Sequence, residues 1–121
     1  MAGIHVGRTV QVLGGKHQLT VDRLDMEPGG VTFHYTVSPP LPEVVAGGGM
    51  LLLYVTATDD QGNVYTDGGG AFGTAPDGSH TEGSVTVQPA PPAGVRDITV
   101  DLVLSESPTE EPHHRFTVRI G

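Results

Sequence analysis

Hydrophobic and polar residues alternate along much of this chain, with the period of two that predicts β-strands. The clearest run lies between residues 31 and 38. Its apolar side chains share one face, which we expect to be buried: Val31, Phe33, Tyr35 and Val37. The polar side chains between them face the other way, as in a strand that covers a core on one side only.

The run before it, His17–Met26, alternates in two halves that are out of phase. The apolar pairs are Leu19 with Val21, and Leu24 with Met26. One extra residue near Asp22–Arg23 would bring both pairs onto the same face, so we predict a β-bulge there. The Pro-Gly-Gly at residues 28–30 then favours a tight turn, and the two runs are predicted to form a hairpin.

Further strands are predicted on both sides of this hairpin. A turn at 59–63 is expected to join the run at 50–58 to an extended segment at 64–66. Residues 67–83 are expected to form a long Gly-rich loop or an edge segment held by Phe72. Residues 50–55 are apolar on both parities, which indicates a central strand covered on both faces at one end. The remaining predicted strands are Ile4–Leu13, Met50–Thr58, Gly83–Gln88, Val95–Ser105 and Arg115–Ile120.

No window shows a convincing helical period beyond one possible turn at Glu43–Ala46. The chain has 121 residues, among them 18 Gly and 10 Pro, and such punctuation is typical of short strands joined by turns. We therefore predict one domain, residues 1–121, with an all-β fold: an antiparallel β-sandwich of seven or eight strands. A closed barrel is the alternative, and the prolines at 39–42 and 89–92 favour the sandwich because they suit crossings between sheets.

The order of these features resembles the immunoglobulin-like domains of unknown function in Gram-positive and actinobacterial surface proteins. The likeness lies in LTVDRLDMEPGGVTFHYTV, LLLYVTATDDQGNVY, DITVDLVLS and RFTVRI. Some of these domains form the extracytoplasmic end of anti-sigma factors. The resemblance implies a bacterial immunoglobulin-like sandwich that binds or supports other proteins, and it brings no catalytic residues.

Charge and composition exclude several classes of partner. Fourteen acidic against six basic residues give a net charge of −8, which disfavours nucleic acid and anionic membranes. The chain has no cysteine, so disulfides and thiolate chemistry are excluded. No signal peptide is evident and no apolar run is long enough to span a bilayer, so we expect a soluble protein, either cytoplasmic or an extracytoplasmic domain without its export signal.

Two groups of side chains are candidate metal ligands. Oxygen ligands of the kind that calcium prefers gather in and after the turn at 59–63: Asp59, Asp60, Asn63 and Asp67, with Asp77 as a further candidate. His34 and the pair His113–His114 are candidates for zinc or copper if their strands are neighbours. For both groups the competing interpretation, which we favour, is ordinary turn capping or solvated surface residues.

The sequence gives weaker evidence for a catalytic site than for a metal site. Asp77, Ser79 and His80 supply the residue types of a triad, but they are close neighbours in a loop without a predicted oxyanion hole. The Gly-rich run at 67–73 lacks the Lys-Ser or Lys-Thr pair and the following helix of a phosphate-binding loop. We therefore expect a protein that is not an enzyme.

The leading hypothesis is a non-catalytic module for protein–protein interaction or structural support, and the alternative is a calcium- or transition-metal-binding module. The partner is expected to be an unidentified protein, contacted through the loops at 39–49 and 67–83. Leu41, Val44 and Val45 in the first loop form a contact patch or, as we favour, cover one end of the sandwich. The first and last strands are candidate sheet edges, and a homodimer formed through them is possible.

Overall fold

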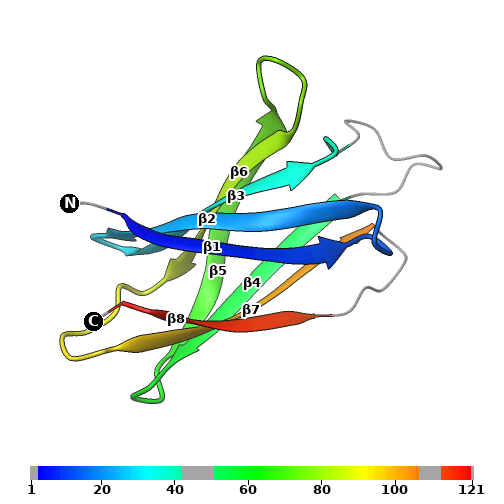
Figure 1. Cartoon of the computed structure of the whole chain (residues 1–121). Helices are drawn as coiled ribbons and strands as arrows, with labels where there is room; N and C mark the ends of the chain where they lie inside the picture. The colour runs from blue at the N-terminus through cyan, green and yellow to red at the C-terminus, as the bar shows by residue number, and fades with distance from the viewer. Residues whose placement is uncertain (1–2, 42–50, 107–112, 121) are drawn as a thin grey trace.

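The computed structural model describes residues 3–41, 51–106 and 113–120. These residues form strands and turns and contain no helix. Eight antiparallel strands follow one another in the sheet order β1-β2-β3-β6-β5-β4-β7-β8 (Figure 1). Their bounds are β1 Ile4–Val12, β2 His17–Glu27, β3 Gly30–Ser38, β4 Leu51–Asp59, β5 Val64–Thr74, β6 Thr81–Gln88, β7 Asp97–Glu106 and β8 His114–Arg119.

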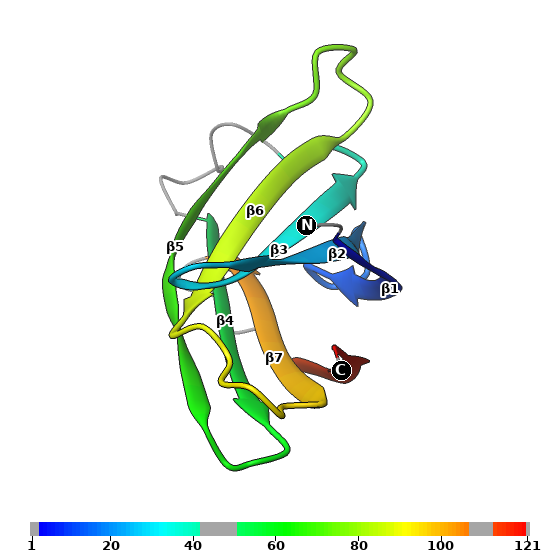
Figure 2. The same ribbon diagram turned by 90° about the vertical axis from the view of Figure 1, so that its left-hand side faces the viewer.

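Strand β5 joins the two halves of the sheet. Its beginning pairs with β4 at Val64 and Tyr65, whereas the stretch Thr66–Thr74 pairs with β6. The sheet curls about this strand until β1 and β8 approach each other, so it is nearly barrel-shaped (Figure 2). The prediction of an all-β antiparallel fold with seven or eight strands is confirmed, and the curled sheet is continuous through β5.

The core lies inside the curl and is supplied by alternate residues of both halves. On β3, all four residues that the alternation assigns to the core are buried. On β7, the inward residues Ile98, Val100, Leu102 and Leu104 are buried as well. Alternation therefore identified the core face of both strands correctly.

The predicted β-bulge is present in β2. Pairing with β3 shifts register between Val21 and Arg23, which leaves Asp22 as the extra residue. The shift brings Leu24 to the same side as Val21, and both are buried. Asp22 faces outward and accepts a hydrogen bond from the Thr36 hydroxyl (2.7 Å), so the bulge is tied to β3.

Of the two alternatives predicted for residues 67–83, the long loop is wrong for the first half, which is extended. Residues 67–74 continue β5 and pair with β6, with a register shift between Asp67 and Gly70. A glycine-rich strand shows no alternation because it has few side chains to alternate. A Cβ on Gly70 would lie against the backbone of Ser84 and Val85, so the close approach of β5 to β6 requires glycine here.

The prediction that β4 is covered on both faces is wrong at Tyr54, whose side chain is 56% exposed. Val55 and Ala57 face the core and are buried. The strand is therefore covered on one face over this part of its length. The possible helical turn at 43–46 and the residues Val44–Val45 lie outside the described residues.

Leu41 covers the core, as favoured for the apolar residues that follow β3. Its side chain is buried, and its N–H donates a hydrogen bond to the hydroxyl of Thr81 (2.8 Å). Thr81 is itself buried at the beginning of β6. This contact fixes the chain after β3 to the neighbouring strand.

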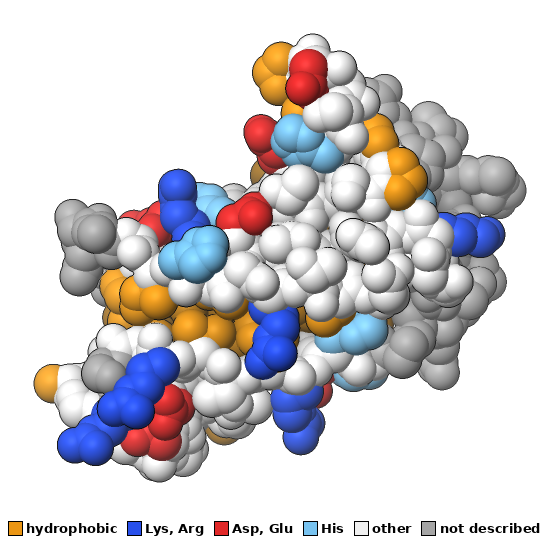
Figure 3. Space-filling model, viewed as in Figure 1, with side chains coloured by type: hydrophobic (Ala, Val, Ile, Leu, Met, Phe, Trp, Pro, Cys, Tyr) orange, Lys and Arg blue, Asp and Glu red, His pale blue; other side chains and the backbone are white. Residues whose placement is uncertain are grey.

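The first and last strands are the two edges of the sheet, as predicted. No backbone ladder joins β1 to β8 within the described ranges. Instead, the Arg8 guanidinium lies over the Phe116 ring, 5.5 Å from its centroid. Hydrophobic side chains are visible along the seam between these two strands (Figure 3).

The described segments include no helix of the length and apolarity needed to cross a membrane.

Candidate functional site

Asp59 organises the turn between β4 and β5. Its Oδ1 accepts hydrogen bonds from the backbone N–H groups of Gln61 (2.8 Å) and Asn63 (2.9 Å). Its Oδ2 accepts from the Asn63 side-chain amide (2.9 Å) and from the Tyr65 hydroxyl (2.6 Å). Both oxygens are thus engaged by donors of the same hairpin, as is typical of an aspartate that stabilises a turn.

The other predicted calcium ligands have separate partners. Asp60 Oδ1 accepts hydrogen bonds from the N–H groups of Arg96 (3.0 Å) and Asp97 (3.3 Å), ahead of and at the start of β7. Asp67 lies farther along β5 and accepts from the N–H of Val55 on β4 (3.3 Å). Within the described part of the chain, no three His, Asp or Glu side chains gather in a way that would hold a metal ion.

The hydrogen bonds of the turn also set the acidity of its groups. Burial raises the pKa of Asp59, but the hydrogen bonds from Tyr65, Asn63 and Gln61 together outweigh it and lower the pKa to about 2. The pKa of Asp60 is lowered by the two backbone hydrogen bonds from Arg96 and Asp97. Both carboxylates are therefore negatively charged at neutral pH, and their charge is stabilised by the fold.

Replacing Tyr65 with phenylalanine is expected to lower the melting temperature at neutral pH, because the buried ring loses its hydrogen bond to an ionised carboxylate. The folded-state pKa of Asp59 lies below its ordinary value of 3.8, so this stabilisation is present above about pH 4 and is lost as the pH falls towards about 2. The difference between wild type and variant should therefore narrow over that interval. Melting curves at several pH values measure this difference in melting temperature. A difference that is independent of pH would contradict its assignment to the hydrogen bond between Tyr65 and Asp59.

The structure separates the histidines that were candidates for a transition metal. His34 lies on β3 and its Nε2 is 2.8 Å from Asp25 Oδ2. His113 precedes β8, and its Nδ1 is 2.7 Å from Asp101 Oδ1. Strands β3 and β8 are not neighbours in the sheet, so His34 does not meet His113 or His114.

The triad-like residues form a hydrogen-bonded chain at the tip of the β5–β6 hairpin. The Ser79 hydroxyl donates to Asp77 Oδ1 (2.7 Å) and also lies 2.7 Å from His80 Nδ1. His80 Nε2 is 3.0 Å from Glu82 Oε1. The single hydroxyl proton of Ser79 is directed to Asp77 and not to His80, whereas activation of a serine nucleophile requires it to be directed to the general base.

A groove opens between β4 and β5. The two strands pair only at Ala57–Thr58 of β4, after which β5 turns away to pair with β6. The divergence leaves an open groove of about 600 Å³, within the size range of ligand-binding clefts. Sequence analysis missed it, because a groove between diverging strands cannot be recognised until both strands are placed.

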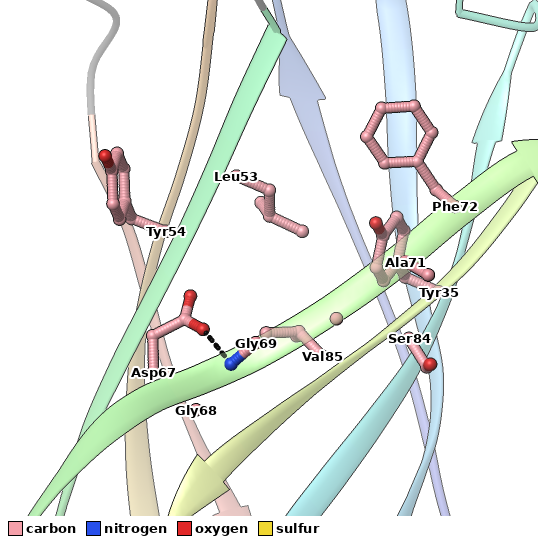
Figure 4. A pocket seen from close by; sticks show the side chains of 11 residues that line it. Tyr35, Leu53, Tyr54, Asp67, Gly68, Gly69, Ala71, Phe72, Ser84 and Val85 are labelled. Carbon is pink, nitrogen blue, oxygen red and sulfur yellow. Dashed lines mark hydrogen bonds between the residues drawn. The ribbon is translucent and has the colours of Figure 1, made fainter.

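Aromatic side chains stand on both sides of this groove (Figure 4). Tyr54 lines it from β4, and Phe72, which is 44% exposed, lines it from β5. Tyr35 reaches it from β3, across Gly83 of β6. The Tyr35 side chain is otherwise buried, and burial together with the negative charge of Asp67 raises the pKa of its hydroxyl to about 12. That hydroxyl remains neutral at physiological pH.

Asp67 lies where the two strands begin to separate (Figure 4). Besides the contact with Val55, its Oδ1 accepts a hydrogen bond from the N–H of Gly69 (2.7 Å). It is the only charged residue among the described residues that line the groove. The groove therefore combines apolar walls with one negative charge at its closed end.

Comparison with known proteins shows a similarity of fold. No protein-family model and no curated protein matches this chain. The crystal structure of a conserved domain protein from Bacillus anthracis is similar, with 16% sequence identity and a TM-score of 0.51. The similarity covers 93% of this chain and 46% of that one, so this chain spans less than half the length of its structural neighbour.

Proposed function

We propose that this domain is a non-catalytic module that binds another protein through the groove between β4 and β5. The observation that carries the proposal is the groove itself, an opening in the sheet with the exposed rings of Tyr54 and Phe72 beside it. Exposed aromatic residues around a concave surface are enriched at protein–protein interfaces. They contribute apolar contact area, and the rigid sheet beneath them holds them in place.

The resemblance to immunoglobulin-like domains of bacterial surface and anti-sigma-factor proteins supports the same proposal, because such domains are implied to bind or support other proteins. The proposal includes an immunoglobulin-like architecture. This part of the proposal is supported by the arrangement in which β1, β2, β3 and β6 face β4, β7 and β8 across the core. The pairing of β5 with both halves distinguishes this sheet from two separate layers.

The calcium-binding alternative lacks comparable support. The carboxylates of Asp59 and Asp60 already accept hydrogen bonds from turn and strand donors, and Asp67 has partners of its own. A calcium ion takes six to eight oxygen ligands around one point. Here the candidate oxygens are directed to different parts of the hairpin and of β7.

The homodimer through the edge strands β1 and β8 stays a prediction.

Selection from a library of random displayed peptides tests the binding function. Wild-type protein is expected to enrich peptides that the double variant Tyr54→Ser/Phe72→Ser no longer retains. Each ring contributes about 1–3 kcal/mol where it is buried by a ligand, so the double variant should weaken binding more than ten-fold.

The control is Val64→Ser, which removes a side chain of similar exposure (63%) outside the groove. Binding to this variant should equal that of the wild type. Failure to enrich any peptide, or equal loss of binding with Val64→Ser and with the double variant, would contradict the proposed site.

A further inference from the structure

We infer that the occupant of the groove is an extended peptide segment that pairs with the free edge of β4 and places a basic side chain against Asp67. The inference rests on the proposed function and deepens it, since it states the conformation and charge of the partner. Three independent features of the groove support it: the backbone edge, the single carboxylate and the apolar floor.

The backbone of β4 offers a pairing edge. On one side β4 pairs with β7 in continuous register from Leu51 to Asp59. The N–H of Val55 points to the other side, where it meets Asp67. Because backbone groups alternate in direction along a strand, the N–H and C=O of Leu53 point into the same gap. No strand pairs with β4 at this position within the described part of the chain.

Unpaired strand edges are the surfaces to which extended peptides add as a further strand. Asp67 blocks the ladder at the N–H of Val55, so the free stretch begins at the Val55 carbonyl and continues towards the start of β4. The edge is held in place because β7 pairs with β4 along the whole length of β4. A peptide would therefore meet a preformed edge.

The charge of the groove selects a basic ligand. Each oxygen of Asp67 accepts one hydrogen bond from a backbone N–H of the described residues, which leaves further lone pairs for a cation. The protein as a whole carries a net charge of −8, which attracts a cationic segment over a long range. An Arg or Lys side chain of an added strand can also lie across the Tyr54 or Phe72 ring in a cation–π contact.

The floor of the groove accepts an apolar side chain. Tyr35, Leu53 and Val85 line both the groove and a small gap in the core beneath it. In an added strand, side chains alternate between the two faces of the sheet. One face of the peptide would thus supply an apolar residue to this floor, and the expected ligand combines apolar and basic residues in an alternating pattern.

Synthetic versions of a peptide that depends on Tyr54 and Phe72 test the inference, with fluorescence anisotropy as the measurement. Methylation of alternate backbone amides should weaken binding at least about ten-fold for one parity and leave the other parity within about two-fold, because only alternate N–H groups face β4. Replacing the basic residue with Gln should weaken binding about ten-fold, and Glu should weaken it further. Binding should also fall as the salt concentration rises.

Asp67→Asn is the matching change in the protein. It should weaken binding of the basic peptide about ten-fold and leave binding of the Gln version unchanged, as a double-mutant cycle requires for a direct contact. If this variant does not fold, the charge series and the salt dependence measured on wild-type protein decide the same point. Folding of each variant is checked by its melting curve.

The outcomes separate this inference from the proposed function. Peptides that bind with equal sensitivity to both methylation parities, or with no preference for a basic residue, overturn the inference and leave the binding site in place. Failure to recover any peptide overturns both. A dimer in sedimentation that the Tyr54→Ser/Phe72→Ser variant dissociates would identify a second copy as the occupant and would also overturn the inference.

Discussion

Replacing Phe33 with alanine is expected to lower the free energy of unfolding by about 3–5 kcal/mol. Phe33 is 2% exposed and lies on β3, where it pairs with Leu24 of β2 and Val85 of β6. Alanine would remove the ring and leave a cavity that three fixed strands cannot close. Since small domains have a total stability of about 5–15 kcal/mol, the loss should be large enough to populate the unfolded state.

The matched control is Phe72→Ala, which removes the same ring from the 44% exposed position beside the groove. We expect a cost of about 1 kcal/mol or less, because the ring is only partly removed from water in the folded state. Urea denaturation measures both values. Equal losses at the two positions would show that the core is not where the buried side chains of β3 place it.

The second large effect is expected for Gly70→Ala. The added Cβ would lie against the carbonyl oxygen of Ser84 and the Cα of Val85, and both are backbone atoms that cannot rotate away. The pairing of β5 with β6 would have to move, at a cost of about 1–3 kcal/mol. Urea denaturation reports the cost, and hydrogen exchange should show faster exchange for the β5 and β6 amides.

Gly73→Ala is the control on the same strand. Apart from Gly73 and its two chain neighbours, no atom of the described residues lies within 4 Å of the position that its Cβ would take. We expect a neutral effect, or a gain of about 0.4–1 kcal/mol from the lower entropy of the unfolded chain. Similar costs at both glycines would mean that glycine is needed along β5 for a reason other than close contact with β6.

The sequence was sufficient for the parts of the fold in which the pattern of apolar and polar side chains reflects the conformation of the backbone. Alternation placed the inward residues of β3 and β7, and the phase change around Asp22 located the bulge in β2. Both inferences depend on a physical rule that holds residue by residue, since neighbouring side chains of a strand point to opposite faces. Turn residues likewise located the hairpins at 27–30 and 59–63.

The sequence was insufficient where side chains are missing or where strand partners decide the outcome. Residues 67–74 read as a loop because four of them are glycine, although Phe72 was a signal of an ordered segment. Tyr54 read as buried because its neighbours are apolar, and its exposure follows from its place on the outer face of β4, opposite to the buried Val55. The groove depends on the divergence of β5 from β4, which is a property of strand pairing and not of any local segment.

The candidate metal ligands illustrate a further reason. Asp59, Asp60 and Asp67 were recognised as acceptors, and they do accept: their partners are backbone N–H groups, a hydroxyl and an amide of the protein itself. A short polar segment does not reveal whether its oxygens converge on one point or disperse. That distinction requires the three-dimensional path of the hairpin.

The seam between β1 and β8 has a consequence for colloidal behaviour. Exposed strand edges with unpaired backbone groups are the usual templates for self-assembly into fibrils. Here the curl turns the two edges towards each other, and the contact between Arg8 and Phe116 bridges them. Conditions that flatten the sheet would present both edges to neighbouring molecules, so we expect them to promote association of the protein through β1 and β8.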